Sequence, residues 1–344
     1  MVRERELVGD RSYFAVVVIT NDKALAAQAL REGKLVALPT ETVYGLAADA
    51  SNAKAVQRIF SVKGRPANHP LIVHIASADQ ISRWARDVPA VAYALADAFW
   101  PGPLTMLLWR HESVCDEVTG GRDTIGLRVP DHELTLSVLQ EFGGAVAAPS
   151  ANRFGKVSPT TAAHVEADLG SDVDVILDGG ACTVGVESTI VDLTAEQPTV
   201  LRLGAITIEQ LADVLGVVPV VHVPHLEADA KAPGMLASHY SPAARVVLAS
   251  SESLEAALLN VQDENPTQKI AVLAPQQSSV LDQVQFADIV ELEPAGDADH
   301  YANVLYDRLR LVDRLGIDIV ICVPPTDSGI GQAVRDRLQR AANK

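Results

Sequence analysis

Short apolar runs of strand length alternate along this chain with segments of helical periodicity, and this alternation limits the fold more than any other feature of the sequence. Lys34-Leu-Val-Ala-Leu-Pro39 is one such run, and a proline stops it. It follows a segment, residues 21–33, whose apolar positions recur at helical spacing up to Gly33, a residue typical of helix ends. A helix followed by a buried strand is the repeating unit of α/β proteins.

The same pattern continues through the first two thirds of the chain. Further helices are predicted at residues 53–62, 88–99 and 207–215, and further strands at 70–75, 104–109, 124–129, 144–148, 173–177 and 189–193. Helices and strands alternate irregularly there, which favours a mixed, twisted sheet with helices over a strictly doubly wound one.

The composition changes after residue 215. The stretch from Gly216 to Pro242 contains four prolines and no long periodic segment, which is typical of a linker or an active-site lid. A βαβ-like series follows, with strands predicted at 245–249, 269–274 and 317–323 and helices at 252–261, 300–315 and 331–342. We therefore expect a first domain over residues 1–216, a linker or lid over 217–242, and a smaller Rossmann-like α/β domain over 243–344.

Charge and cysteine content exclude several classes of protein. Lys and Arg total 28 against 44 Asp and Glu, and the net charge of −16 argues against a protein that coats nucleic acid non-specifically. The three cysteines are far apart and give neither a disulfide framework nor a thiolate zinc site, so a reducing cytoplasm is expected. The start of the chain does not read as a signal peptide, and no apolar run approaches the roughly 20 residues of a membrane span.

Simple phosphate-binding and metal-binding motifs do not explain this sequence. It contains no P-loop, and Gly329-Ile-Gly331 lacks the third glycine of a dinucleotide site, so a tight turn between a strand and a helix is the better interpretation. His222 and His225 flank a proline without further ligands beside them and are interpreted as linker residues rather than a metal site.

Two groups of cations admit both a structural and a functional interpretation. Lys63 and Arg65 follow the helix 53–62, where they either interact with its C-terminal dipole or neutralise a ligand. Arg128 lies on an apolar strand and needs an anion, which is either a structural carboxylate or the carboxylate or phosphate of a ligand.

Three loops beside predicted strands carry small polar side chains. Thr40-Glu-Thr-Val-Tyr-Gly45 and Pro149-Ser-Ala-Asn152 each follow a strand, and Gly185-Val-Glu-Ser-Thr-Ile190 leads into one. Side chains at the ends of strands can contact a ligand at the edge of a sheet, although ordinary turns use the same residues.

Together with further motifs, these segments resemble the YrdC-type threonylcarbamoyl-AMP synthases over residues 21–216. The matching segments are Pro39–Leu46, Lys63–Pro66, Pro70–His74, Trp100-Pro-Gly-Pro-Leu-Thr105, Pro149–Asn152, Gly185–Ile190 and Leu201-Arg-Leu-Gly204. Ala232-Pro-Gly-Met235, Ser238-His-Tyr-Ser-Pro242 and the second domain resemble the longer, two-domain form of that family.

The resemblance implies an enzyme, a nucleotidyltransferase that makes threonylcarbamoyl-AMP and diphosphate from L-threonine, bicarbonate or CO2, and ATP for the modification of tRNA. It implies Lys63 and Arg65 as catalytic residues and Mg²⁺ carried by ATP rather than by protein side chains. The implied ATP contacts are Lys63, Arg65, His69, Thr124, Ser150, Asn152, Ser158 and Arg202, with His239 and Tyr240 from the lid. The implied L-threonine contacts are Thr40, Thr42, His74, Arg128, Ala148 and Ser188.

The same resemblance implies downstream tRNA threonylcarbamoyl transferase proteins as partners, with no membrane and no stable direct binding of tRNA. Two other functions stay open at this point. An RNA-binding module could use a concave face with Lys63, Arg65, Arg128 and Arg202, although the negative net charge counts against it. A scaffold regulated by nucleotide binding to the second domain is the other.

Overall fold

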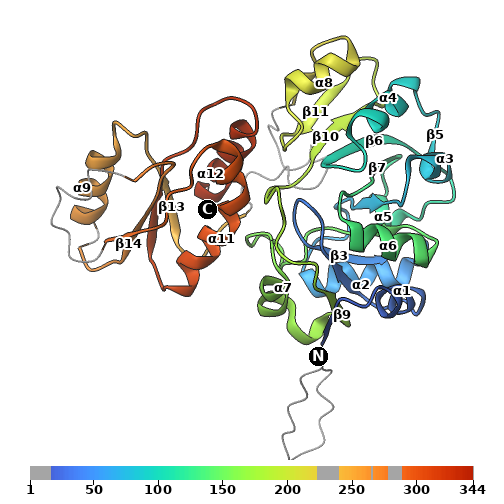
Figure 1. Ribbon diagram of the computed structural model, residues 1–344, viewed down its shortest axis with the longest axis horizontal. Helices are drawn as coiled ribbons and strands as arrows, with labels where there is room; N and C mark the ends of the chain where they lie inside the picture. Colours follow the sequence, from blue (N-terminus) through green and yellow to red (C-terminus); the bar gives the residue numbers. More distant parts are fainter. Residues whose placement is uncertain (1–16, 223–239, 265, 278–288, 344) are drawn as a thin grey trace, which may run out of the picture.

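Two α/β domains form the molecule (Figure 1). The computed structural model describes residues 17–222, 240–264, 266–277 and 289–343. The first domain holds a large mixed sheet, and the second holds four parallel strands in the order β13-β16-β14-β15. The predicted α/β fold with a mixed first sheet is confirmed.

The large sheet runs β1-β9-β2-β3-β8-β4-β7-β6-β10-β11-β12, with β5 beside β6. Its strands are β1 (Val18–Thr20), β2 (Val36–Leu38), β3 (Gly45–Asp49), β4 (Ile72–His74), β5 (Ala85–Arg86), β6 (Leu104–Arg110), β7 (Thr124–Arg128), β8 (Val146–Ala147), β9 (Val175–Leu177), β10 (Thr189–Asp192), β11 (Thr199–Arg202) and β12 (Val220–Val221). Parallel pairs such as β4/β7 alternate with antiparallel pairs such as β6/β7, which makes the sheet mixed.

Helices cover this sheet and bury its apolar side chains. They are α1 (Lys23–Arg31), α2 (Ala53–Lys63), α3 (Ile81–Trp84), α4 (Ala90–Phe99), α5 (Asp116–Thr119), α6 (Glu133–Phe142), α7 (Ala162–Leu169) and α8 (Ile208–Leu215), with 3₁₀ turns η1 (Ala78–Gln80) and η2 (Gly170–Asp172). The main core cluster takes residues from Leu35 to Leu211, and α1 and α6 pack in a separate, smaller cluster.

Helix α2 shows how local sequence places a functional side chain. Asn52 caps its first turn by accepting a hydrogen bond from the amide of Ala55 at 3.2 Å, and Gly64 ends it in the left-handed conformation at φ 65°. Ile59 packs into the core, so the helix is fixed against the sheet. Its last residue, Lys63, is thereby buried at the edge of a pocket.

The second domain is a three-layer unit. It contains β13 (Arg245–Leu248), α9 (Leu254–Glu264), β14 (Ile270–Leu273), β15 (Ile289–Glu291), α11 (Ala298–Arg314), β16 (Ile319–Cys322) and α12 (Gly331–Ala342). Helix α9 packs on one face of its sheet, while α11 and α12 pack on the other and face the first domain (Figure 1).

The predicted helices and strands are present, with small differences at their ends, and several elements were not predicted. Strand β3 is missing from the sequence analysis because Gly-Leu-Ala-Ala-Asp has no β-branched residue, and packing on both sides holds it in the sheet. Helices α3, α5, α6 and α7 and strands β5, β11, β12 and β15 were also not predicted. Strand β12 lies within the predicted linker, yet pairs in parallel with β11 and so extends the first sheet.

One hydrophobic cluster is common to both domains. Val43, Val157 and Val186 of the first domain pack in the same cluster as Leu305 and Leu338 of the second. The two domains therefore share apolar surface that neither could bury alone. In the part of the chain that the structure describes, no helix is both long enough and apolar enough to cross a bilayer.

Candidate functional site

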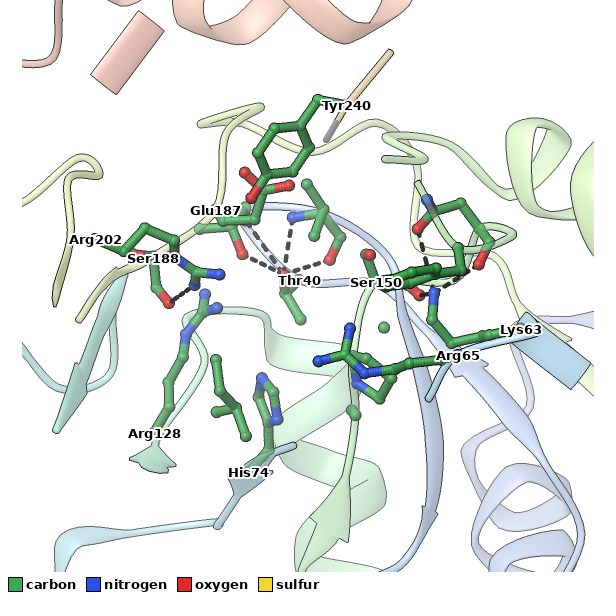
Figure 2. A pocket seen from close by; sticks show the side chains of 18 of the residues that line it. Thr40, Lys63, Arg65, His74, Arg128, Ser150, Glu187, Ser188, Arg202 and Tyr240 are labelled. Carbon is green, nitrogen blue, oxygen red and sulfur yellow. Dashed lines mark hydrogen bonds between the residues drawn. The ribbon is translucent and has the colours of Figure 1, made fainter. Parts of the chain in front are cut away.

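A pocket of about 640 Å³, its open mouth included, lies where the loops after β2, α2 and β8 meet the loop before β10 (Figure 2). Its lining combines small polar residues, four cations and one carboxylate with a histidine and several apolar and aromatic residues. These are Thr40, Thr42, Val43, Gly45, Lys63, Arg65, Ile72, His74, Arg128, Ala148, Pro149, Ser150, Asn152, Phe154, Gly155, Glu187, Ser188, Arg202 and Tyr240.

Lys63 and Arg65 form one wall of the pocket. The Lys63 ammonium donates hydrogen bonds to the carbonyl oxygens of Ser150 and Asn152, both at 2.5 Å, and Arg65 donates to the carbonyl oxygen of Pro70 at 3.1 Å while lying over the ring of Phe154. Burial and the nearby Arg65 lower the pKa of Lys63 well below its usual value, and burial lowers that of Arg65 to about 10. These groups would regain favourable electrostatics when an anion enters.

Arg128 and His74 form the opposite wall, at the ends of the paired strands β7 and β4. The anion that the sequence requires for Arg128 is the structural carboxylate of Glu41, 2.7 Å away, and both side chains are about 95% buried. Burial and the charge of Arg128 lower the pKa of His74 to about 3, so its imidazole is neutral. A second anion at this wall would therefore share the Arg128 guanidinium with Glu41 or displace it.

Ser188 lies beside Arg202 and is fixed from two sides. Its hydroxyl lies 2.8 Å from that of Thr105, and Arg202 donates to its hydroxyl and to its carbonyl oxygen, each at 2.9 Å. Across the pocket, the Thr40 hydroxyl lies 2.8 Å from that of Thr42 and donates to the carbonyl oxygen of Val43 at 2.6 Å. The hydroxyls therefore have fixed positions before any ligand arrives.

Glu187 and Tyr240 cover the mouth of the pocket (Figure 2). Burial alone would raise the pKa of Glu187, but Arg337, Arg202 and hydrogen bonds from Ser158 and Tyr306 lower it to about 2. Its carboxylate is therefore ionised. Tyr240 is buried and has a positive φ of 61°, a conformation uncommon for a residue other than glycine.

The structure brings most of the predicted site residues together. The lining includes all six predicted threonine contacts and six of the predicted ATP contacts, namely Lys63, Arg65, Ser150, Asn152, Arg202 and Tyr240. Three other predicted ATP contacts, Ser158, His69 and Thr124, do not form part of this lining. Ser158 bonds to Glu187 behind it, His69 lies edge-on to Phe154, Thr124 begins strand β7, and His239 falls outside the described residues.

Sequence reasoning assigned no role to Glu41, Phe154 or Glu187. Glu41 and Glu187 stand inside motifs that the sequence analysis quoted. In each motif a carboxylate adjoins two hydroxyl residues, and this pattern could have indicated that the carboxylates belong to the site. Their partners could not be predicted, because Arg128 and Arg337 are distant in the chain and meet them only in the fold.

The cations of the site point inward. Lys63, Arg65, Arg128 and Arg202 are each at most 9% exposed, so they suit a small anion inside the pocket and not an RNA strand along the surface. Glu187 in the lining and Glu41 next to it are both paired with arginines, and no group of three or more potential metal-ligating side chains occurs among the described residues. Hence the pocket offers the charge and hydroxyl groups for phosphates and a carboxylate.

Two family models match the chain. A model described as "Telomere recombination", with the family name Sua5_yciO_yrdC, matches residues 28–204. The model described as "Threonylcarbamoyl-AMP synthase, C-terminal domain" matches residues 206–343. Together they cover both domains of the structure.

Relatives of known name are similar over almost the full chain. The threonylcarbamoyl-AMP synthase of Pyrococcus abyssi is 40% identical and that of Bacillus subtilis 39% identical, with 92% and 94% of this chain and 93% and 94% of those proteins covered. Among solved structures, P. abyssi Sua5 complexed with L-threonine has a TM-score of 0.87 at 38% identity, covering 95% of this chain and 97% of that one.

Proposed function

Because this chain belongs to the threonylcarbamoyl-AMP synthases in their two-domain form, we propose that it joins L-threonine, bicarbonate or CO2, and ATP into threonylcarbamoyl-AMP and diphosphate. It is an enzyme of that family. The observation that carries the proposed reaction is the arrangement of the pocket, in which Lys63 and Arg65 lie on one side, Arg128 and His74 on the other, and the fixed hydroxyls of Thr40 and Ser188 line the same space.

The wall of Arg128 and His74 suits the amino acid. The guanidinium of Arg128 would take the threonine carboxylate, displacing or sharing Glu41, and Ser188 or the Thr40–Thr42 pair would accept or donate to the threonine hydroxyl. A solved relative, P. abyssi Sua5, is described as complexed with L-threonine, which supports L-threonine as the amino acid that this family binds.

The reaction can be written in two steps. The threonine amine nitrogen attacks the carbon of CO2 and loses a proton, which gives a carbamate. One carbamate oxygen then attacks the α-phosphorus of ATP, and the bond from that phosphorus to the bridging oxygen breaks, so that diphosphate leaves. Transfer of this kind needs positioning and neutralisation of charge more than a covalent nucleophile.

The wall of Lys63 and Arg65 would supply that neutralisation. Their positive charges lie in a buried site where interactions with phosphate are stronger than in water, and Ser150 and Asn152 follow on the same side. The magnesium ion enters as part of the MgATP substrate, since the carboxylates of the pocket are engaged by arginines. Thr124, Ser158, His69 and His239 remain proposed contacts of the nucleotide.

Tyr240 would shield the product from water. Its ring covers the mouth of the pocket (Figure 2), and a mixed anhydride of carbamate and phosphate hydrolyses readily if water reaches it. We infer that the protein works in the cytoplasm and passes the product to transferase proteins that modify tRNA, without binding tRNA stably itself.

Diphosphate release from ATP tests this proposal. We expect the full chain to release diphosphate only when L-threonine and bicarbonate are both present, and to incorporate labelled bicarbonate into an adenylate. Release that ignores threonine would contradict the proposed substrate. Binding of tRNA without any threonine-dependent release would favour the RNA-binding alternative.

A further inference from the structure

Glu187, on the pocket wall, binds two side chains from the second domain. One carboxylate oxygen accepts a hydrogen bond from the Ser158 hydroxyl at 2.7 Å. The other accepts from the Tyr306 hydroxyl at 2.7 Å and from Nε of Arg337 at 2.9 Å. Helices α11 and α12 thus complete the hydrogen bonds of a carboxylate that lines the pocket of the first domain.

Arg337 contacts two residues of the pocket lining, Glu187 and Tyr240, and the residue next to a third. Besides Glu187, it donates through Nη2 to the carbonyl oxygen of Leu203 at 2.9 Å, directly after Arg202, and its guanidinium lies 5.2 Å from the centre of the Tyr240 ring. Its own side chain is fully buried. Tyr306 stacks on Tyr240, with its ring centre 5.7 Å from that of Tyr240.

The segments of the first domain that lead to Ser158 and Glu187 pack against α11 at several points. Gly185, two residues before Glu187, comes so near the helix that a Cβ atom there would lie 2.5 Å from the carbonyl oxygen of Ala302. Asn303 donates to the carbonyl oxygens of Cys182 and Thr183, both at 2.9 Å. Arg310 pairs with Asp168 and donates to the carbonyl oxygens of Val157 and Ser158.

We propose that Arg337 and Tyr306 are positioning residues through which the second domain fixes the pocket of the first. They hold Glu187 in place, and Glu187 holds the segments that carry Ser158, Ser188 and Arg202. This inference rests on the proposed function, because those three side chains are the proposed contacts of ATP and threonine.

A chain of contacts connects the position of Glu187 to the ligand-binding side chains of the pocket. Ser188 follows Glu187 in the chain, and Arg202 binds both the hydroxyl and the carbonyl oxygen of Ser188. A shift of the Glu187 carboxylate would therefore displace one side of the pocket, while the wall of Lys63 and Arg65, which is hydrogen-bonded to carbonyl oxygens of the first domain, stays in place. Weaker ATP binding is the expected consequence.

Helix α11 supplies a matched pair of substitutions. Tyr306→Phe removes the hydroxyl that binds Glu187 but keeps the stacked ring. Tyr301→Phe makes the same change five residues earlier, at a buried tyrosine whose hydroxyl meets no hydrogen-bond partner among the described residues. Arg337→Lys is a second test of the same contact, because it keeps the charge but loses the planar group that reaches Glu187 and Leu203 together.

The full-length variants are compared by the KM for ATP in diphosphate release, by ATP affinity in calorimetry, and by thermal melting. We expect Tyr306→Phe and Arg337→Lys to raise the KM and the dissociation constant about tenfold, the effect of losing one hydrogen bond to a charged acceptor, with Tyr301→Phe unchanged. Substitutions that only reduce the folded fraction lower kcat per mole of protein and leave KM as it is.

Equal KM values for Tyr306→Phe and Tyr301→Phe, with Arg337→Lys also unchanged, would overturn the inference. We also expect Tyr306→Phe to add little to Glu187→Gln, since both act through one carboxylate, and additive effects would contradict that route. If the wild-type chain released no diphosphate with threonine, the proposed function would fail, and the ATP affinities would still decide the inference.

Discussion

Lys63 is a buried cation that donates its hydrogen bonds to neutral oxygen atoms. Burying a charge in this way is costly, and the lowered pKa of the Lys63 ammonium expresses that cost. A helix-dipole role would not require this degree of burial, because the dipole also stabilises an exposed cation in the last turn. The burial of Lys63 beside Arg65 therefore favours the functional interpretation.

Substitution of these cations separates the two interpretations. Lys63→Ala or Arg65→Ala should lower kcat/KM by roughly 100-fold, the loss typical of one preorganised electrostatic contact. Lys54→Ala, at an exposed position on the same helix, is the control and should keep full activity. A small loss of stability with nearly intact diphosphate release would instead support the helix-dipole role.

His74 makes stability depend on pH. Its pKa in the folded protein is about 3, because of burial and the charge of Arg128, against about 6.5 in an unfolded chain. Below pH 6.5 the unfolded chain therefore binds a proton that the folded protein does not, and the stability conferred by neutral His74 declines as the pH falls toward 3. At pH 5 the unfolding free energy is therefore about 2 kcal/mol lower, through His74 alone, than at neutral pH.

Urea unfolding at pH 7.5 and pH 5 measures this effect. The drop in unfolding free energy between the two pH values should be smaller in His74→Gln than in the wild type by about 2 kcal/mol. His111→Gln changes an exposed histidine and should leave the drop as it is. An identical drop in the wild type and His74→Gln would show that His74 titrates normally.

The sequence could predict which residues gather at the site better than which residues pair there. Thr40, Ser150 and Ser188 stand beside predicted strands, and strand ends converge at the edges of a sheet, so their meeting was expected. The Arg128–Glu41 pair was open in the sequence, since a ligand would satisfy Arg128 equally well. Only the fold shows that the protein supplies its own carboxylate.

At the scale of elements, the packing of the segment before β10 against α11 explains why residue 185 is a glycine. Gly185 has φ 85°, and a Cβ atom would meet backbone atoms of α11 at 2.5–2.6 Å. Glycine is therefore required twice, once by the backbone conformation and once by the close approach to a helix. A motif that reads as a turn in the sequence is in fact a docking contact between domains.

Gly185→Ala tests this contact against conformational strain alone. Gly180→Ala is matched, because Gly180 has φ 86° and a methyl group added there would have no neighbouring atom within 4 Å. Both variants carry the strain of a left-handed alanine, about 1 kcal/mol, but only Gly185→Ala must move α11. We expect its melting temperature to fall several degrees further than that of Gly180→Ala, and equal shifts would refute the docking role.

At the scale of the whole molecule, the shared hydrophobic cluster and the contacts of Arg337 and Arg310 join the two domains. Sequence analysis separated the domains by composition but could not show their contact. Tyr306 lies 119 residues and Arg337 150 residues from Glu187, and nothing in local periodicity links them. The helices α11 and α12 read as ordinary amphipathic helices until the first domain is placed against them.

Because the domains share a hydrophobic cluster and these arginine contacts, we expect them to unfold together. All three tryptophans, Trp84, Trp100 and Trp109, lie in the first domain, so tryptophan fluorescence reports that domain alone, whereas far-UV circular dichroism reports both. We expect the two signals to give one coincident thermal transition. Separate midpoints, with the dichroism changing in two steps, would mean that the shared cluster does not couple the domains.

The 150 residues between Glu187 and Arg337 also have a consequence for synthesis of the chain. At about 5–20 residues per second, a ribosome makes Arg337 roughly 8–30 s after Glu187. During that interval the carboxylate of the nascent first domain lacks the guanidinium that neutralises it in the finished protein. Native packing around Glu187 is therefore reached only when the last helix has been translated, so a premature stop even a few codons before Arg337 would leave a long polypeptide with an incomplete pocket.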